Sequence, residues 1–230
     1  MPENTPAEPV SATRDQETKF TRSSRLLFGI SAPAIILVPI AGVALSMVAD
    51  PPAVDRWWRS VIVPSRTEPL TRVAEFFDVW GADGLGFGVF PGLIALALLL
   101  TRKARAIPGI VVAGSVSLLL VQTLKPILDR ARPDDMLTIS DVGSFPSGHV
   151  TNAATLCTFA ALIYRRLAVT VMAIGYVLTM AWSRTYLSAH WLSDTIAGAL
   201  WGAAVAAVVF IAGSAIAGQR LRRRAIAESR

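Results

Sequence analysis

Two histidines, the only ones in the chain, stand beside apolar stretches. His149 lies in the segment GSFPSGHVTNA, where turn-forming residues lead into an apolar run, and His190 precedes Asp194 by four residues. A carboxylate next to an imidazole fixes its tautomer and stabilises the cation formed later, which is the arrangement of an activated nucleophile. In such a site His149 would be free to protonate a leaving group.

Three cations accompany the histidines. Lys125 and Arg132 follow one apolar run, and Arg184 ends another. Arginine presents a planar fork that suits phosphate oxygens, whereas lysine supplies a point charge. Ser147 and Gly148 stand where a helix is predicted to begin, so unpaired N–H groups and the helix dipole would attract an anion there, and glycine would let it approach the backbone. These five residues are predicted to bind phosphate.

Each of these residues also has a purely structural interpretation. Lys125 and Arg184, taken singly, suit side chains that end a membrane span and reach for water, and His190 with Asp194 could form a structural hydrogen bond. Arg130 is interpreted as a surface or salt-bridging residue. The nearby carboxylates are interpreted as solvated and have no familiar metal-ligand spacing, so neither a metal site nor a cofactor is predicted. They are Asp134, Asp135 and Asp141. The conjunction of so many polar groups on one membrane face favours function.

The composition indicates an integral membrane protein that forms a single domain. Of the 230 residues, 53% are hydrophobic and 17% are charged, against about 25% charged in ordinary soluble domains. The net charge of +6 comes from basic residues at the ends of apolar segments, which is a membrane-orientation pattern and excludes a nucleic-acid partner. The single cysteine, Cys157, excludes an intramolecular disulfide and is expected in the core.

The apolar runs predict an all-α fold with six transmembrane helices. The expected spans are Leu26–Val48, Gly84–Leu100, Ile107–Leu124, Val150–Tyr164, Leu167–Trp182 and Asp194–Ala217. The first run is too late and too long for a cleaved signal peptide. We therefore expect a disordered tail over residues 1–24, a membrane domain over residues 25–218 and a basic tail over residues 219–230.

Short interfacial helices are predicted in the long first external loop, because tryptophan and phenylalanine alternate there with charges. We interpret this aromatic set as an interfacial collar rather than a substrate groove. In the last span, Gly198 and Gly202 have the spacing of closely packed helices. Pro126 predicts a helix break near Lys125, followed by a short helix that carries Arg132.

The distribution of charge predicts the orientation. The two tails and the short loops at residues 101–106 and 165–166 carry 14 basic and 5 acidic residues, whereas the other loops carry 8 basic and 11 acidic residues. The basic side is expected to be cytoplasmic. Both termini would then be inside the cell, and the histidines and cations would face the periplasm or exterior of the cell membrane.

Three motifs in this order resemble the type 2 phosphatidic acid phosphatase superfamily, which includes membrane lipid phosphatases. They are KPILDRARP (125–133), PSGH (146–149) and SRTYLSAHWLSD (183–194). The resemblance implies that His190 is the nucleophile, that Asp194 orients it and that His149 is the acid. It implies that the predicted phosphate-binding residues hold the phosphoryl oxygens without a metal.

The resemblance also implies a lipid phosphate or diphosphate as the substrate, held by its tail between helices. A polyprenyl diphosphate such as undecaprenyl or decaprenyl diphosphate is the first expectation, because an external site suits recycling of that carrier. Phosphatidylglycerol phosphate and phosphatidic acid are the alternatives. A lipid phosphotransferase and a non-catalytic lipid-phosphate binder or transporter also stay open, as does the oligomeric state.

Overall fold

A computed structural model describes residues 10–81, 85–139 and 143–228, and within these ranges the chain is helical and has no strand. The predicted all-α class is therefore confirmed. The helices are α1 (Val10–Ser46), α2 (Ala53–Ile62), α3 (Glu68–Gly81), α4 (Phe90–Leu100), α5 (Ile107–Leu128), α6 (Gly148–Tyr164), α7 (Leu167–Tyr186) and α8 (Leu192–Glu228). A π-helical turn, η1 (Leu85–Val89), precedes α4, and a 3₁₀ turn, η2 (Ala104–Ala106), precedes α5.

In the part of the chain that the structure describes, four helical stretches are long and apolar enough to cross a membrane. These stretches are Leu27–Ser46, Ala104–Leu128, Leu167–Tyr186 and Leu192–Gln219. They carry exposed large apolar side chains, such as Ile36, Leu119 and Met172, which suit contact with lipid. Of the other two expected spans, α4 has 11 residues and α6 has 17. Gly84, the expected start of the second span, lies outside the described residues.

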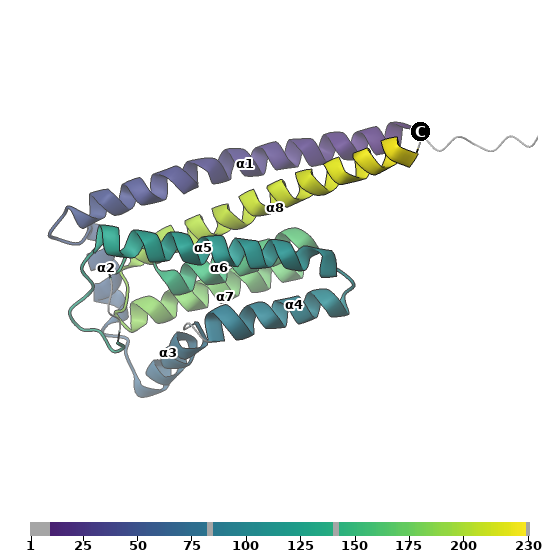
Figure 1. The fold of residues 1–230 in the computed structure, drawn as a ribbon. Helices are drawn as coiled ribbons and strands as arrows, with labels where there is room; N and C mark the ends of the chain where they lie inside the picture. Colours follow the sequence, from purple (N-terminus) through teal and green to yellow (C-terminus); the bar gives the residue numbers. More distant parts are fainter. Residues whose placement is uncertain (1–9, 82–84, 140–142, 229–230) are drawn as a thin grey trace, which may run out of the picture.

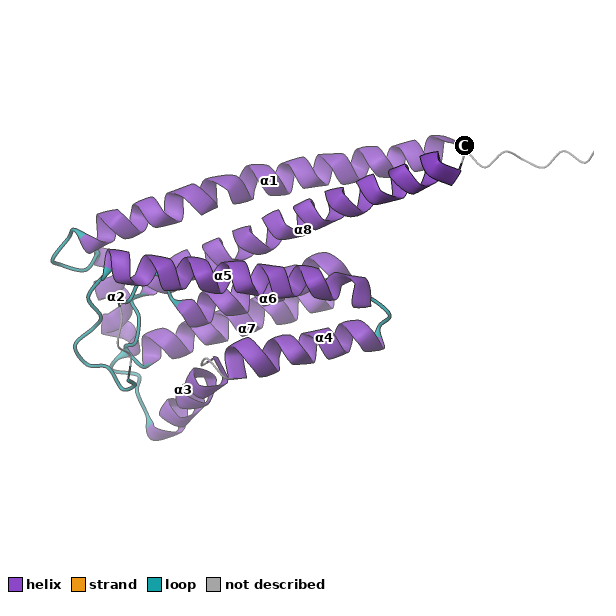
Figure 2. Cartoon of the chain, in the orientation of Figure 1, coloured by secondary structure: helices purple, strands orange, loops and turns teal. Residues whose placement is uncertain are grey.

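The connecting segments show how the helices alternate. Figure 2 places the segments that follow α1, α2 and α5 at one end of the bundle and the connection between α4 and α5 at the other end. In Figure 1 the long helices α1 and α8 run side by side, and their outer ends lie together at the end away from α2. The predicted site segments therefore meet at one end of the bundle.

Two helix boundaries differ from the sequence expectations. Helix α1 begins at Val10, inside the segment 1–24 that was expected to be a disordered tail, and it continues through Pro33 and Pro39. The break predicted near Lys125 is also absent. Helix α5 continues through Pro126 to Leu128, and Asp129 ends it in a left-handed conformation with φ 38°. A proline in the last turn removes only one helical hydrogen bond, and Arg132 follows in an irregular segment rather than a helix.

The segment between α1 and α4, which was expected to be the first external loop, contains α2 and α3, so the short helices predicted there are confirmed. Helix α3 is fastened to α7, where the Ser183 hydroxyl donates a hydrogen bond of 2.8 Å to the carbonyl of Ala74. Ala74 is fully buried. The loop is thus packed onto the bundle at the end where the predicted site residues gather.

Helices α6 and α8 pack closely at the centre, and the small-residue interpretation of α8 is confirmed. A Cβ atom at Gly202 would lie 2.3 Å from the carbonyl oxygen of Thr151, and one at Gly198 would lie 2.8 Å from that of Ser147. Cys157, on α6, is buried as expected. The close approach of α8 sets the position of the α6 N-terminus.

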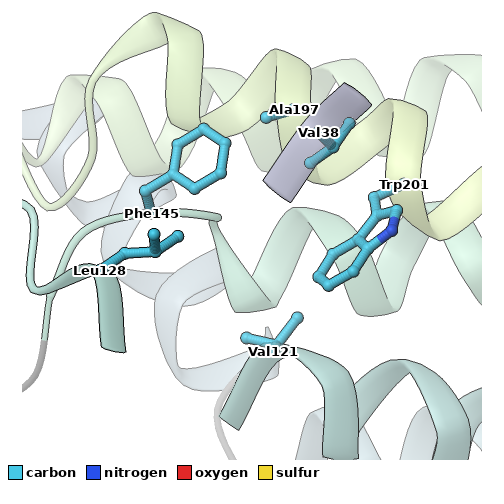
Figure 3. Close-up of a cluster of buried hydrophobic side chains, with 6 residues drawn as sticks. All are labelled: Val38, Val121, Leu128, Phe145, Ala197 and Trp201. Carbon is cyan, nitrogen blue, oxygen red and sulfur yellow. The ribbon is translucent and has the colours of Figure 1, made fainter. Parts of the chain in front are cut away.

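A buried apolar cluster joins the elements that carry the site (Figure 3). It consists of Val38, Val121, Leu128, Phe145, Ala197 and Trp201. Phe145 is fully buried and belongs to the segment that leads into α6. The cluster therefore holds the end of α5, the start of α6 and the start of α8 in fixed positions.

Candidate active site

His190 lies in the short segment between α7 and α8. The backbone N–H groups of Ala189 and His190 both donate to the carbonyl of Arg184, at 3.0 and 3.3 Å, so the segment folds back on the end of α7. His190 is only 3% exposed. Its Nδ1 lies 2.7 Å from the carbonyl oxygen of Ser144. A carbonyl only accepts, so Nδ1 carries the proton and Nε2 keeps its lone pair.

Asp194 contacts His190 differently from the expected arrangement. Because α8 begins only at Leu192, the two residues do not share a helical face. The Asp194 Oδ2 atom is 3.6 Å from His190 Nδ1 and accepts a hydrogen bond of 2.9 Å from the N–H of Trp191. The Ser144 carbonyl thus makes the closest contact with His190 Nδ1, and Asp194 caps the helix behind it.

Arg130 connects Asp194 to helix α2. Its guanidinium forms ion pairs with Asp194 and with Asp55 on α2, the latter at 2.9 Å. Asp55 Oδ1 and Oδ2 also accept hydrogen bonds of 2.8 and 2.7 Å from the N–H and hydroxyl of Ser193. All three charged side chains are at most 5% exposed. Arg130 is therefore a buried residue, so of the two interpretations from the sequence the salt-bridging one is confirmed and the surface one is wrong.

His149 and Arg184 meet at a carboxylate that the sequence analysis missed. The Nε2 atom of His149 lies 3.1 Å from the carbonyl oxygen of Asp78 and 3.4 Å from its Oδ1. Arg184 forms an ion pair with the same Oδ1, and the hydroxyl of Thr138 donates to Oδ2. The signal that could have indicated Asp78 is a single acid within the aromatic run FFDVW of α3.

Two buried donors at this site have no hydrogen-bond partner within the described residues. They are the hydroxyl of Ser147 and the Nε atom of Arg184. Ser147 is the residue that precedes α6, in an extended conformation, so the first N–H groups of that helix have no helical acceptor. A buried polar atom left without a partner costs free energy. The pair therefore indicates a polar ligand at the start of α6.

Gly148 and Arg132 complete the surroundings of the α6 N-terminus. A Cβ atom at Gly148 would make only an ordinary contact of 3.5 Å with Val121, so packing inside the protein does not require glycine there. Arg132 donates to the carbonyl of Ala189, next to His190, and to that of Gly143 at 3.2 Å. Its guanidinium thus stands beside the imidazole of His190.

The electrostatic surroundings keep His190 neutral. Burial lowers the pKa of His190 well below 6.5, and the charges of Arg132, Lys125, Arg184 and His149 lower it further. This set shows that the structure brings all the predicted cations around one imidazole. Burial also lowers the pKa of His149, with the charge of Arg184 acting in the same direction, although the hydrogen bond to Asp78 opposes the shift.

The carboxylates nearby differ from the solvated loop residues that were expected. Asp135 is only 30% exposed and pairs with Arg59 and Arg66, at 2.7 and 2.9 Å. Asp134 is exposed, as expected, and Asp141 lies outside the described residues. Among the described residues no three His, Cys, Asp or Glu side chains form a group that could hold a metal ion.

Comparisons with known proteins agree with this arrangement. The model of the PAP2 superfamily matches residues 105–216. A Mycobacterium tuberculosis protein named decaprenylphosphoryl-5-phosphoribose phosphatase is 32% identical over 151 residues, which cover 63% of this chain and 80% of that protein.

Two solved structures share the fold. The crystal structure of the first transmembrane PAP2 type phosphatidylglycerolphosphate phosphatase from Bacillus subtilis aligns with a TM-score of 0.59 and 26% identity, over 81% of this chain and 92% of that one. LpxE from Aquifex aeolicus aligns with a TM-score of 0.62 and 24% identity, over 71% of this chain and 99% of that one. At the latter identity the likeness shows the fold alone.

Fold and site together define a multi-pass helical membrane protein that gathers cations and histidines at one end of its bundle. The chain belongs to the PAP2 superfamily of type 2 phosphatidic acid phosphatases, and the resemblance predicted from its three motifs is confirmed. It is a lipid phosphatase of that family.

Proposed function

We propose that the protein cleaves a lipid phosphate through a phosphohistidine on His190. The observation that carries the proposal is the neutral, buried imidazole of His190 among the three predicted cations, near two donors without partners. A neutral imidazole with its Nε2 lone pair available is a nucleophile. The cations, Ser147 and the N-terminus of α6 would bind the phosphoryl oxygens and stabilise the charge that develops on them.

The reaction would proceed in two displacements. The bound phosphate, an anion, would raise the pKa of His149 so that it is an imidazolium in the complex. The Nε2 lone pair of His190 attacks phosphorus, the bond between phosphorus and the leaving oxygen breaks, and the His149 imidazolium gives that oxygen a proton and becomes neutral. Water then attacks the phosphohistidine, giving a proton to His149 while the bond between nitrogen and phosphorus breaks. Inorganic phosphate leaves, and both imidazoles return to their first states. The contact between Ser144 and Nδ1 keeps the reactive tautomer throughout, with Asp194 close behind it to stabilise positive charge.

The substrate would be a phosphate carried by a polyprenyl lipid. A polyprenyl diphosphate was the expectation from the sequence, and the mycobacterial relative is named for a decaprenyl lipid that bears a phosphoribose. Phosphatidylglycerol phosphate is the second candidate, because the Bacillus neighbour is named for it. Phosphatidic acid is the third member of the class.

The site would face the periplasm or exterior of the cell membrane, with both termini in the cytoplasm. Six spans give this arrangement if α4 and α6 cross together with the four longer apolar helices. Basic residues at the end of the bundle away from the histidines support the orientation. No metal is needed in this scheme, because the arginines and lysine supply the positive charge.

Phosphate release by the purified protein, beside its His190→Ala variant, tests the proposal. Both proteins would be assayed in detergent with EDTA against a polyprenyl diphosphate, a polyprenyl monophosphate, phosphatidylglycerol phosphate and phosphatidic acid. We expect release by the wild type and none by the variant. Full activity in a folded variant would remove His190 as the nucleophile, and activity that required added metal would overturn the metal-free scheme.

A phosphotransferase and a non-catalytic binder give different results in the same assay. A binder would release no phosphate from any lipid. A phosphotransferase would release it only when a lipid or sugar hydroxyl is present to accept the phosphoryl group. An acceptor screen would therefore follow a negative result with well-folded protein.

A further inference from the structure

The carboxylate of Asp78 stands on the side of the site from which the leaving group must depart. The proposed acid, His149, points its Nε2 atom at Asp78. The backbone carbonyl oxygen and the Oδ1 atom of Asp78 both lie near that nitrogen, and both are acceptors, so Nε2 carries a proton. A leaving oxygen that takes this proton must come within hydrogen-bond distance of Nε2, and therefore next to Asp78.

Asp78 is held firmly in this position by the packing of α3. The bond from Ser183 to Ala74 fastens the helix to α7 one turn before Asp78. One turn after Ala74, Phe77 packs against Tyr176, with ring centroids 6.3 Å apart. At the end of the helix, a Cβ atom at Gly81 would lie 2.4 Å from the imidazole of His149. Only glycine allows this approach, so the carboxylate is a fixed part of the site.

The carboxylate is ionised under ordinary conditions. Burial by itself would raise the pKa of Asp78, but the hydrogen bond with His149, the charge of Arg184 and the hydroxyl of Thr138 hold that pKa well below its usual value. When a phosphoryl group binds, Arg184 would turn toward the phosphoryl oxygens. Asp78 would then present its negative charge to whatever is attached to the leaving oxygen.

We propose that Asp78 is a specificity-determining residue that disfavours substrates whose leaving group is itself a phosphate. This inference rests on the proposed function and narrows its substrate class from lipid monophosphates and diphosphates to lipid phosphomonoesters alone. In a diphosphate, the leaving group is a phosphate whose charge comes into contact with Asp78, and like charges at such distances repel. In a phosphomonoester, the leaving group is a neutral alcohol, whose hydroxyl groups can donate hydrogen bonds to the carboxylate.

The position of Asp78 in the chain agrees with a role in selection rather than in the shared chemistry. The proposed nucleophile, acid and cations all lie within residues 105–216, which match the family model. Asp78 lies before this region, in helix α3. The mycobacterial relative is named for a lipid that bears a phosphate on its ribose. Hydrolysis of a phosphate ester on a sugar has a neutral alcohol, the sugar hydroxyl, as its leaving group.

The test compares two lipids with the same tail. Farnesyl diphosphate and farnesyl monophosphate would be hydrolysed by the wild type, by Asp78→Asn, which removes the charge and keeps the shape, and by the matched control Glu75→Gln. Glu75 lies on the same helix and is exposed. The first readout is the ratio of kcat/KM for the diphosphate to kcat/KM for the monophosphate. An effect of the substitution on His149 does not cancel in that ratio, because an alcohol needs the proton of the acid more than a phosphate does. The second readout is therefore the ratio of the two Kd values, which involves no proton transfer to a leaving group.

We expect Asp78→Asn to raise the ratio of kcat/KM values by about tenfold or more, and Glu75→Gln to leave it unchanged. An unchanged ratio in Asp78→Asn would overturn the inference. The two lipids would also be bound to His190→Ala with and without Asp78→Asn, and Asp78→Asn must strengthen binding of the diphosphate relative to the monophosphate; a kinetic ratio that rose without this shift in Kd would assign the effect to His149 and overturn the inference. Loss of activity in His190→Ala tests the proposed nucleophile separately, so the two ideas can fail independently.

Discussion

Substitution of Asp55 tests whether the buried network of Asp55, Arg130 and Asp194 holds His190 in position, because Asp55 is buried and does not itself contact His190. Its side chain is fully buried and accepts three hydrogen bonds, one from Arg130 and two from Ser193. Replacing Asp55 with alanine leaves the N–H of Ser193 without its acceptor and takes one counter-ion from the buried guanidinium of Arg130. Breaking a buried ion pair in this way costs about 3–5 kcal/mol.

The loss should lie near the lower end of that range, because Arg130 keeps its ion pair with Asp194. A cost of about 3 kcal/mol corresponds to a fall in Tm of about 6–12 °C for a domain of this size. Activity should also fall at temperatures where the protein stays folded, since Asp55 holds Ser193 and Arg130, and Arg130 holds Asp194 beside His190. Thermal unfolding in detergent and initial rates at low temperature would measure the two effects.

The control is Glu68→Ala, which removes the ion pair of Glu68 with Arg72 on the exposed face of α3. Both of its side chains are about three-quarters exposed, and such a helical pair contributes less than about 0.5 kcal/mol. Its Tm should therefore remain close to that of the wild type. If Asp55→Ala lowered Tm no more than this control, the buried network would not be the support that we infer.

Three further predictions concern packing, pH and topology. Gly202→Ala should lower the free energy of unfolding by about 1–3 kcal/mol, because its Cβ would collide with the α6 backbone. The control Gly213→Ala on the same helix should leave it unchanged, because nothing lies within 4 Å of a Cβ there. Thermal unfolding would compare the two variants. The pKa of His190 in the folded protein lies well below 6.5, so as pH falls through 6.5 the unfolded chain takes up a proton before the folded protein does, and stability falls. Tm should therefore decline less steeply in His190→Asn than in the wild type. Equal slopes would contradict the lowered pKa of His190. A cysteine at Asp50 should react with an impermeant thiol reagent in intact cells, and one at Arg102 only after permeabilisation; the reverse pattern would invert the proposed orientation.

The sequence indicated which charged residues would lie near His190 better than it indicated how the site residues contact one another. The sequence identified three cations, because a charged side chain at the end of an apolar run is costly and is often functional. They are Lys125, Arg132 and Arg184, and in addition to burial all three lower the pKa of His190. The start of α6 at Gly148 followed from the turn-forming residues before it. These predictions used residue type and local spacing, which a single sequence displays directly.

Contacts between distant segments were not visible in the same way. The acceptor for His190 is the backbone carbonyl of Ser144, and every residue has a carbonyl, so no residue type marks it. The start of α8 after His190 was also missed, because a cap formed by Asp194 on Trp191 cannot be distinguished in sequence from a pairing of Asp194 with the histidine. In both cases the tertiary fold decides which of several available partners is used.

The role of the segment between α1 and α4 was underestimated, because its aromatic residues suggested only contact with the membrane interface. Its two helices each contribute one carboxylate to the site, and both lie outside the segment that matches the family model. Asp55, from α2, secures the start of α8 behind the nucleophile, whereas Asp78, from α3, faces the proposed acid. Residues 105–216 would thus supply groups for phosphoryl transfer, and the segment between α1 and α4 would supply groups that hold them and that meet the leaving group. Asp78 contacts His149 and Arg184, so a substitution there would act on the side of the site where the leaving group departs, while the contacts of His190 with Ser144 and Asp194 stay in place.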